Sequence, residues 1–340
     1  MFEKISKFRK EIMGAAILLI IMCHSTLYIE HAAISRMYTL IKQFSKIGVD
    51  LFFFVSGLGL YFSFSRDSDL LRFYRKRLLR IVPQYTIVIA CWGIIAVGLS
   101  LETVREFIWK YSLISFYLSG ELAAWFVAAI ILLYVVFPLF YGLLRKGSAY
   151  LIELCILIYG LTFCITFHFA PATPLCYVNE AFFVRVPTFL AGVVIGEQSK
   201  NVHSDGISHP CGWIYAASGV CVILWLVNAN ADVFCGRWIE RVVFMPTTVC
   251  IAIVLGSCLD KCCARIRQML VFFGSITLEI YLIHEKVLLI CDTYIPRSIA
   301  GSILSNAVAV TITILLSYCL GKCVDRLMRK YRTGQDGNKR

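Results

Sequence analysis

Long runs of apolar residues, separated by short charged or turn-rich segments, follow one another along the whole chain. A bilayer core is roughly 30 Å thick, so a helix that crosses it needs about 20 mostly apolar residues. Runs of this length predict an all-α fold, a polytopic integral membrane helix bundle of about ten transmembrane helices. The predicted spans are residues 12–30, 47–64, 80–99, 123–144, 150–168, 181–197, 211–229, 242–259, 269–290 and 299–321. The sixth is short and contains both Arg185 and Pro187, which is typical of a broken helix.

Composition agrees with this interpretation. Of the 340 residues, 59% are hydrophobic and 16% are charged, whereas soluble domains carry about 25% charged residues. The mean hydropathy is +0.77. No repeat or Pro-rich linker divides the sequence, so we predict one domain over residues 1–340, with a short basic tail from about residue 322.

The formal net charge is +12, and the basic residues are unevenly placed. Of the 33 Lys and Arg residues, 23 lie in the N-terminus, the segments 65–80, 145–149, 198–210 and 260–268, and the C-terminal tail. Basic segments stay on the cytoplasmic side of a membrane, so both termini are predicted to be cytoplasmic. Because these residues sit between spans rather than along one face, they indicate a lipid bilayer as partner and not a nucleic acid.

Most of the fifteen cysteines lie within apolar spans, where they are expected to serve as packing residues. Cys258, Cys262 and Cys263 come closest to metal-ligand spacing. A zinc site normally needs a second pair of ligands, and none follows here, so the sequence predicts no metal site.

Ionisable side chains inside a span cost about 2.5–3.5 kcal/mol, so each is a candidate functional residue. At a rise of 1.5 Å per residue, His24 lies roughly 21 Å from Lys10, in the outer half of the bilayer. The same arithmetic predicts a similar depth for four other residues, namely Asp50, Trp125, Arg185 and His284. Glu279 lies one to two turns deeper than His284, with Tyr281 between them.

Each of these residues also has a structural interpretation. His24 and His284 can hydrogen-bond a neighbouring helix, and Asp50 can cap the second span. Arg185 can form an ion pair with Glu279. Arg77 and Arg80 lie three positions apart at the cytoplasmic mouth of the third span. The alternative for this pair is that it serves as a topology signal and nothing more.

Six segments, in this order along the chain, resemble the acyltransferase 3 family of integral membrane O-acyltransferases. They are Gly14–Ser25, Gly48–Gly57, Phe73–Tyr85, Trp125–Val127 with Tyr134 and Pro138, Arg185–Gly192, and Phe273–His284. The second is the most specific, and the third contains the family's pair of arginines at Arg77 and Arg80.

The resemblance implies transfer of an acyl group, with acetyl the expected group, from cytoplasmic acyl-CoA to a hydroxyl. The acceptor implied is an envelope or extracellular carbohydrate or a lipid-linked glycan, and the location is the cytoplasmic membrane of a bacterium. Acetyl-CoA would be a co-substrate, with no permanently bound cofactor. Arg77 and Arg80 would then hold the donor's phosphates, because guanidinium groups bind phosphate bidentately.

We predict that His24 is the general base, because imidazole titrates near neutrality. Asp50, at a similar depth, is predicted to orient the imidazole. The other candidates for the lining of the site are Trp125, Arg185, Glu279, Tyr281 and His284.

One position departs from the family pattern. An arginine usually precedes the first-span histidine by eleven positions, where this chain has Met13, and Arg9 lies one helical turn earlier. A multi-pass transporter and a non-catalytic membrane scaffold related to the family therefore stay open as alternatives.

Overall fold

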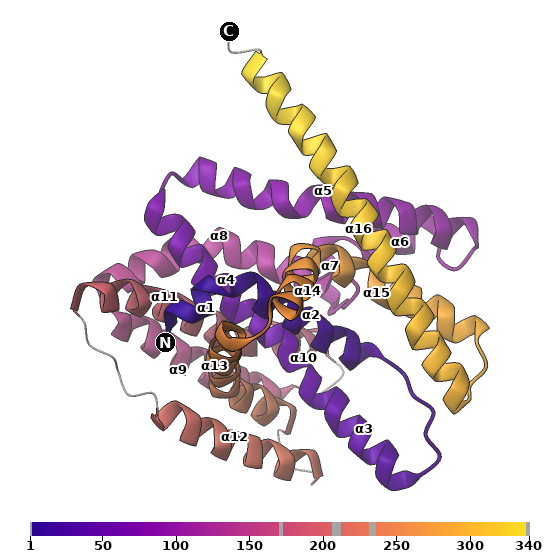
Figure 1. Cartoon of the computed structure of the whole chain (residues 1–340), viewed down its shortest axis with the longest axis horizontal. Coiled ribbons are helices and arrows are strands. Elements are labelled where there is room, and N and C mark those ends of the chain that lie inside the picture. Colours follow the sequence, from indigo (N-terminus) through magenta and orange to yellow (C-terminus); the bar gives the residue numbers. More distant parts are fainter. Residues whose placement is uncertain (1, 170–172, 206–211, 231–235, 338–340) are drawn as a thin grey trace.

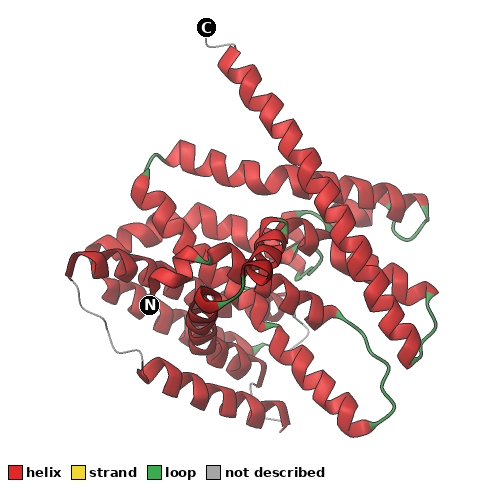
Figure 2. Cartoon of the chain, viewed as in Figure 1, coloured by secondary structure: helices red, strands yellow, loops and turns green. Residues whose placement is uncertain are grey.

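A computed structural model describes residues 2–169, 173–205, 212–230 and 236–337. Over these residues every regular element is a helix, and Figure 2 shows no strand among them. The predicted all-α fold is confirmed.

The helices follow the predicted apolar runs, with additional short helices between them. The first half of the chain contains α1 (Phe2–Lys7), α2 (Arg9–His24), α3 (Ala32–Ser45), α4 (Ile47–Arg66), α5 (Leu70–Gly98), α6 (Val104–Lys110), α7 (Leu113–Ser119) and α8 (Trp125–Lys146). The second half contains α9 (Ser148–His168), α10 (Pro174–Ala181), the 3-10 turn η1 (Phe183–Arg185), α11 (Val186–Asp205), α12 (Gly212–Asn230), α13 (Gly236–Lys261), α14 (Ala264–Ser275), α15 (Thr277–Tyr294) and α16 (Ile299–Gly337).

Within the described part of the chain, eight helices are long and apolar enough to cross a membrane, or nine if α14 and α15 form one span. The chain is therefore a multi-pass integral membrane protein. The predicted first span, residues 12–30, corresponds to α2, which has only 16 residues and ends at His24. Those residues extend over roughly 24 Å, less than the thickness of a bilayer core.

Two predicted spans are broken in the structure. The sixth, predicted over residues 181–197, is interrupted near its start by the turn η1, which contains Arg185 just before Pro187, and it continues as α11. This break is the one that the sequence indicates. The ninth, predicted over residues 269–290, is bent, because α14 and α15 meet at an angle of 75° beside Ile276.

Glycines bring the central helices into direct backbone contact. A Cβ atom on Gly57 of α4 would overlap the carbonyl oxygen of Phe189 on α11, and one on Gly192 of α11 would overlap that of Phe54 on α4. Small residues of this kind allow membrane helices to approach closely. In Figure 1, α4 lies in the middle of the bundle, while α5 and α16 lie along its side.

Two of the basic segments meet in space. Lys4 and Lys7 of α1 pair with Asp260 near the end of α13, at 2.9 and 3.0 Å. Their proximity is what segments on one side of a membrane require. The assignment of that side to the cytoplasm stays a prediction.

Candidate functional site

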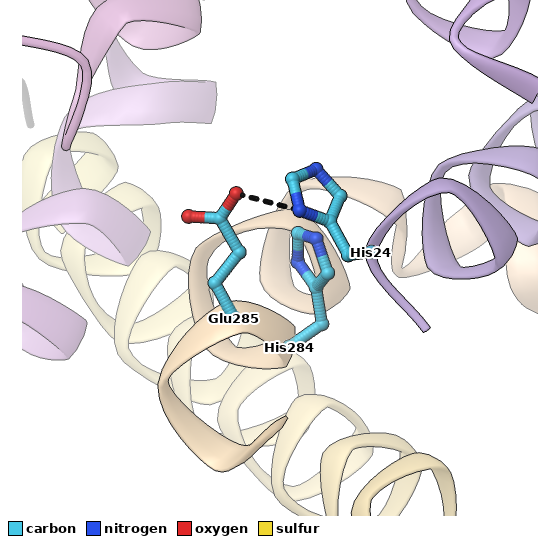
Figure 3. Close-up of side chains that lie close together, drawn as sticks. All are labelled: His24, His284 and Glu285. Atoms are coloured by element: carbon cyan, nitrogen blue, oxygen red, sulfur yellow. Dashed lines mark ion pairs between the residues drawn. The ribbon is translucent and has the colours of Figure 1, made fainter. Parts of the chain in front are cut away.

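His24 lies at the end of α2, where the helix stops because Ser25 adopts an extended backbone conformation. The hydroxyl of Ser25 donates to the carbonyl of Met22 at 2.7 Å and thereby closes the last helical turn. The Nδ1 atom of His24 lies 3.2 Å from a carboxylate oxygen of Glu285 on α15. Figure 3 shows this ion pair, with His24 approaching α15 from a different helix. Both side chains are partly exposed, His24 by 39% and Glu285 by 52%.

His284 packs directly against His24. The two rings meet edge to face with their centroids 5.0 Å apart. His284 is buried, and its Nδ1 atom lies 2.8 Å from the carbonyl of Tyr281 and 3.0 Å from that of Ile280. Carbonyl groups only accept hydrogen bonds, so Nδ1 carries the proton and Nε2 carries a lone pair. This Nε2 atom is buried and has no hydrogen-bond partner among the described residues.

Asp50 was predicted to contact His24, but it does not. It is fully buried on α4, where its carboxylate lies 3.5 Å from Nε of Arg185 and 3.9 Å from a guanidinium nitrogen of Arg241. The carboxylate beside His24 is Glu285. Depth along a helix says how far a side chain lies from each membrane surface, but it does not say which way that side chain points.

The interpretation of Arg185 and Glu279 as an ion pair is also wrong, because Arg185 pairs with Asp50. Arg185 additionally donates to the carbonyl of Glu180 at 2.8 Å, and its guanidinium lies 5.4 Å from the centre of the Trp125 ring. Glu279 is buried elsewhere and accepts a hydrogen bond from Gln84 of α5.

Three cavities lie along these helices, and the second shares lining residues with each of the other two. The first, which we call the histidine pocket, has a volume of about 250 Å³. Its wall includes His24, Trp125 and Arg185, three of the side chains that were predicted to share one layer. It also includes Lys46, Tyr177 and Arg241, which the sequence did not single out.

The second cavity, the narrow channel, has a volume of about 90 Å³. It shares Ile20 with the histidine pocket, one helical turn before His24. Tyr281 lines this channel, and its ring centre lies 6.0 Å from that of His284. Neither histidine lines the narrow channel, but Ile20 and Tyr281, which lie near them, do.

The third cavity, the basic vestibule, has a volume of about 510 Å³. Six cationic side chains line it, whereas its wall contains a single carboxylate, that of Asp67. The cations are Arg9, Arg66, Arg72, Lys76, Arg77 and Arg80. Three of them, Arg9, Arg77 and Arg80, also line the narrow channel, so these two cavities are neighbours.

Arg77 stands between aromatic rings at this junction. Its guanidinium lies 5.6 Å from the centre of the Phe73 ring and 5.9 Å from that of Tyr134. Its Nε atom is buried and makes no hydrogen bond within the described chain. Aromatic packing holds such a guanidinium in place while leaving its N–H groups available to an anionic ligand.

Comparison with protein families gives one match, to a family model described as an acyltransferase domain, over residues 14–322. The match covers nearly the whole chain. The chain belongs to the acyltransferase 3 family. Its general activity is therefore acyl transfer at a membrane. No curated protein and no solved structure matches the chain.

Position 13, where the family resemblance led us to expect an arginine, lies in the wall of the narrow channel. Met13 lines the narrow channel together with Arg9. A Cβ atom on Gly59 would lie only 2.7 Å from a guanidinium nitrogen of Arg9, so the glycine makes room for this side chain. Arg9 therefore places a guanidinium in the channel from one turn earlier on the same helix.

Glu285 is the residue of this acyltransferase that sequence reasoning missed. It directly follows His284, immediately after the last of the segments that resemble the family. An acidic residue next to an intramembrane histidine was the available signal.

Proposed function

We propose that this acyltransferase transfers an acyl group, in the first place acetyl, from acyl-CoA in the cytoplasm to a carbohydrate hydroxyl across the membrane. The acceptor would be an envelope or extracellular carbohydrate, or a lipid-linked glycan, at the cytoplasmic membrane of a bacterium. The observation that carries the proposal is the series of cavities that share lining residues, with cations around the basic vestibule and His24, paired with Glu285, in the wall of the histidine pocket.

The basic vestibule suits the donor. Coenzyme A carries several phosphate charges, and the six cations of the vestibule exceed its one carboxylate. Arg72 is already paired with Asp67 at 2.8 Å, so the guanidinium groups of Arg77 and Arg80 are the better candidates for phosphate. The thin acyl-bearing arm of the donor would enter the narrow channel, directed toward the histidines.

His24 is placed to act as the base. If Nδ1 donates its proton to Glu285, the Nε2 lone pair is available to take the proton of the acceptor hydroxyl. The resulting oxygen nucleophile attacks the thioester carbonyl, and the C–S bond breaks as the ester C–O bond forms. The imidazolium then returns its proton to the departing CoA thiolate. Glu285 stabilises the imidazolium during this sequence. No permanently bound cofactor takes part.

The histidine pocket suits a carbohydrate acceptor. Trp125 and Tyr177 provide aromatic surfaces, and Lys46, Arg185 and Arg241 provide hydrogen-bond donors for hydroxyl groups. Asp50 would support this pocket indirectly, because it holds Arg185 and Arg241 in place.

Donor binding can be tested without knowledge of the acceptor. We would purify the protein in detergent and measure binding of acetyl-CoA to the wild type and to the double variant Arg77→Ala/Arg80→Ala. The matched control is Lys261→Ala/Arg265→Ala, which removes the same charge from another predicted cytoplasmic segment, outside the vestibule. Each lost hydrogen bond to a charged group is worth about 1.5–3 kcal/mol, so affinity should fall at least tenfold in the first double variant only.

Absence of acetyl-CoA binding by folded wild-type protein would contradict the proposal. The transporter and scaffold alternatives would then move ahead. A transporter would be recognised by solute flux into sealed vesicles without any acyl-CoA.

A further inference from the structure

The histidine cluster has the composition of a metal site. One ligand atom each from His24, His284 and Glu285 lie within 4.8 Å of one another. No other group of three or more histidine, cysteine or acidic residues is gathered in this way within the described part of the chain. Figure 3 shows His284 and Glu285 extending from the same helix toward His24.

His284 is already arranged as a metal ligand. Metal-bound histidines usually donate the other ring N–H to a carboxylate or a backbone carbonyl, which fixes the tautomer and the ring orientation. His284 makes this contact through Nδ1 with the carbonyl of Tyr281 at 2.8 Å. The whole residue is only 1% exposed, and its Nε2 atom has no hydrogen-bond partner within the described residues. A buried polar atom without a partner costs about 1–3 kcal/mol, and a cation would satisfy it.

We propose that His24, His284 and Glu285 form a binding site for a divalent transition metal of the Zn²⁺ class. Two histidines and one glutamate are a known ligand set for zinc with an open fourth position for water. Carboxylate and imidazole ligands bind at about 2.0–2.2 Å, so the three side chains must move closer together when the ion binds. The partial exposure of His24 and Glu285 leaves room for that movement and a path for the ion.

The consequence for activity rests on the proposed function. A metal on Nε2 of His24 would take the lone pair that the acceptor proton needs. A metal on Nδ1 would leave the ring proton on Nε2, which could then no longer accept a proton. In either case Zn²⁺ at this site inhibits acyl transfer, so the site couples activity to metal concentration on the side of the histidine pocket.

The sequence predicted no metal because its one candidate was the cysteine group Cys258, Cys262 and Cys263. The ligands here come instead from α2 and α15, which are far apart in the sequence. Only the folding of the chain brings them together.

The first test measures binding alone. Co²⁺ is added to the purified full-length protein as a spectroscopic probe, and Zn²⁺ binding is measured by calorimetry. We expect one equivalent to bind, with the visible absorption of Co²⁺ in a four-coordinate site. Affinity should fall at least tenfold in His284→Gln and in Glu285→Gln, and it should be unchanged in His31→Ala, an exposed histidine outside the cluster.

Glu285 is half exposed, so its variant should fold even if replacement of the buried His284 disturbs packing. Binding that is absent in folded wild-type protein, or that survives in folded Glu285→Gln at full affinity, would overturn the proposed site. Neither result depends on acyl transfer, so the metal site and the proposed function can fail separately.

The second test adds Zn²⁺ to wild-type membranes during acyl transfer. Reversible inhibition that a chelator removes supports the coupling, whereas undiminished acyl transfer at metal concentrations that saturate the site would overturn it.

Discussion

The Nδ1 atom of His24 lies 3.2 Å from the carboxylate of Glu285, and this contact joins the end of α2 to the middle of α15. A carboxylate beside an imidazole fixes the tautomer and stabilises the protonated ring. The contact therefore helps to orient the imidazole of His24, which lines the histidine pocket.

The contact predicts a positioning role for Glu285. We expect Glu285→Gln to lower the maximal rate of acyl transfer by about 10²-fold, the lower end of what general acid–base catalysis contributes. The apparent KM for acetyl-CoA should be unchanged, because the carboxylate lies outside the basic vestibule. A purely structural role would lower the amount of folded protein, but it would not lower the maximal rate of the folded protein at an unchanged KM. Glu30→Gln, at an exposed residue outside the cavities, is the control.

Asp50 is predicted to act through stability rather than as the partner of His24. Asp50→Asn would leave buried Arg185 without its carboxylate partner, which costs about 3–5 kcal/mol, whereas Arg241 would keep Glu240 at 3.6 Å. We expect a large loss of thermal stability in detergent. Asp260→Asn should have a small effect, because its partners Lys4 and Lys7 are exposed to solvent. An Asp50→Asn protein with wild-type stability and no acyl transfer would instead restore Asp50 to a catalytic role.

Arg9, the first residue of α2, is predicted to contact the acyl donor. Arg9→Ala should weaken acetyl-CoA binding about tenfold, because a hydrogen bond to a charged group is worth about 1.5–3 kcal/mol. Met13→Arg in the Arg9→Ala background should recover much of the affinity, because positions 9 and 13 are one turn apart and both line the narrow channel. Unchanged binding in Arg9→Ala would show that this guanidinium does not contact the donor.

The backbone contact between α4 and α11 predicts the effect of a small substitution. Gly192→Val would place side-chain atoms on the carbonyl oxygen of Phe54, so the two helices must separate. Overpacking of this kind costs about 1–3 kcal/mol, which a thermal unfolding experiment in detergent would detect. Gly142→Val is the matched control, because a Cβ atom there meets nothing within 4 Å. Equal stability of the two variants would contradict the tight contact.

The apolar runs were sufficient to predict the fold class and the position of most spans, because the bilayer thickness dictates their length. They were not sufficient for α2, which ends at His24 although apolar residues continue to Ile29. The end of that helix depends on the extended conformation of Ser25 and on tertiary contacts, such as the hydrogen bond between Ser25 and Tyr38. The bend between α14 and α15 was not predicted either, because the apolar run continues through it without a break in its composition.

For the candidate site, helix depth correctly gathered His24, Trp125 and Arg185 around one pocket. It could not distinguish Asp50 from Glu285 as the neighbour of His24, because that choice depends on the rotation of each helix about its axis. The family resemblance supplied the activity, which the spacing of polar residues alone did not.

The most direct test of the account is transfer of labelled acetyl from acetyl-CoA to the glycan fraction of inside-out membrane vesicles, with wild type compared to His24→Gln. His168→Gln, at an exposed histidine at the end of α9, is the control. The account predicts that transfer falls at least about 10²-fold in His24→Gln while acetyl-CoA binding is retained, because the base is lost and the vestibule is intact. Transfer at the wild-type rate by His24→Gln, at equal protein level, would contradict it.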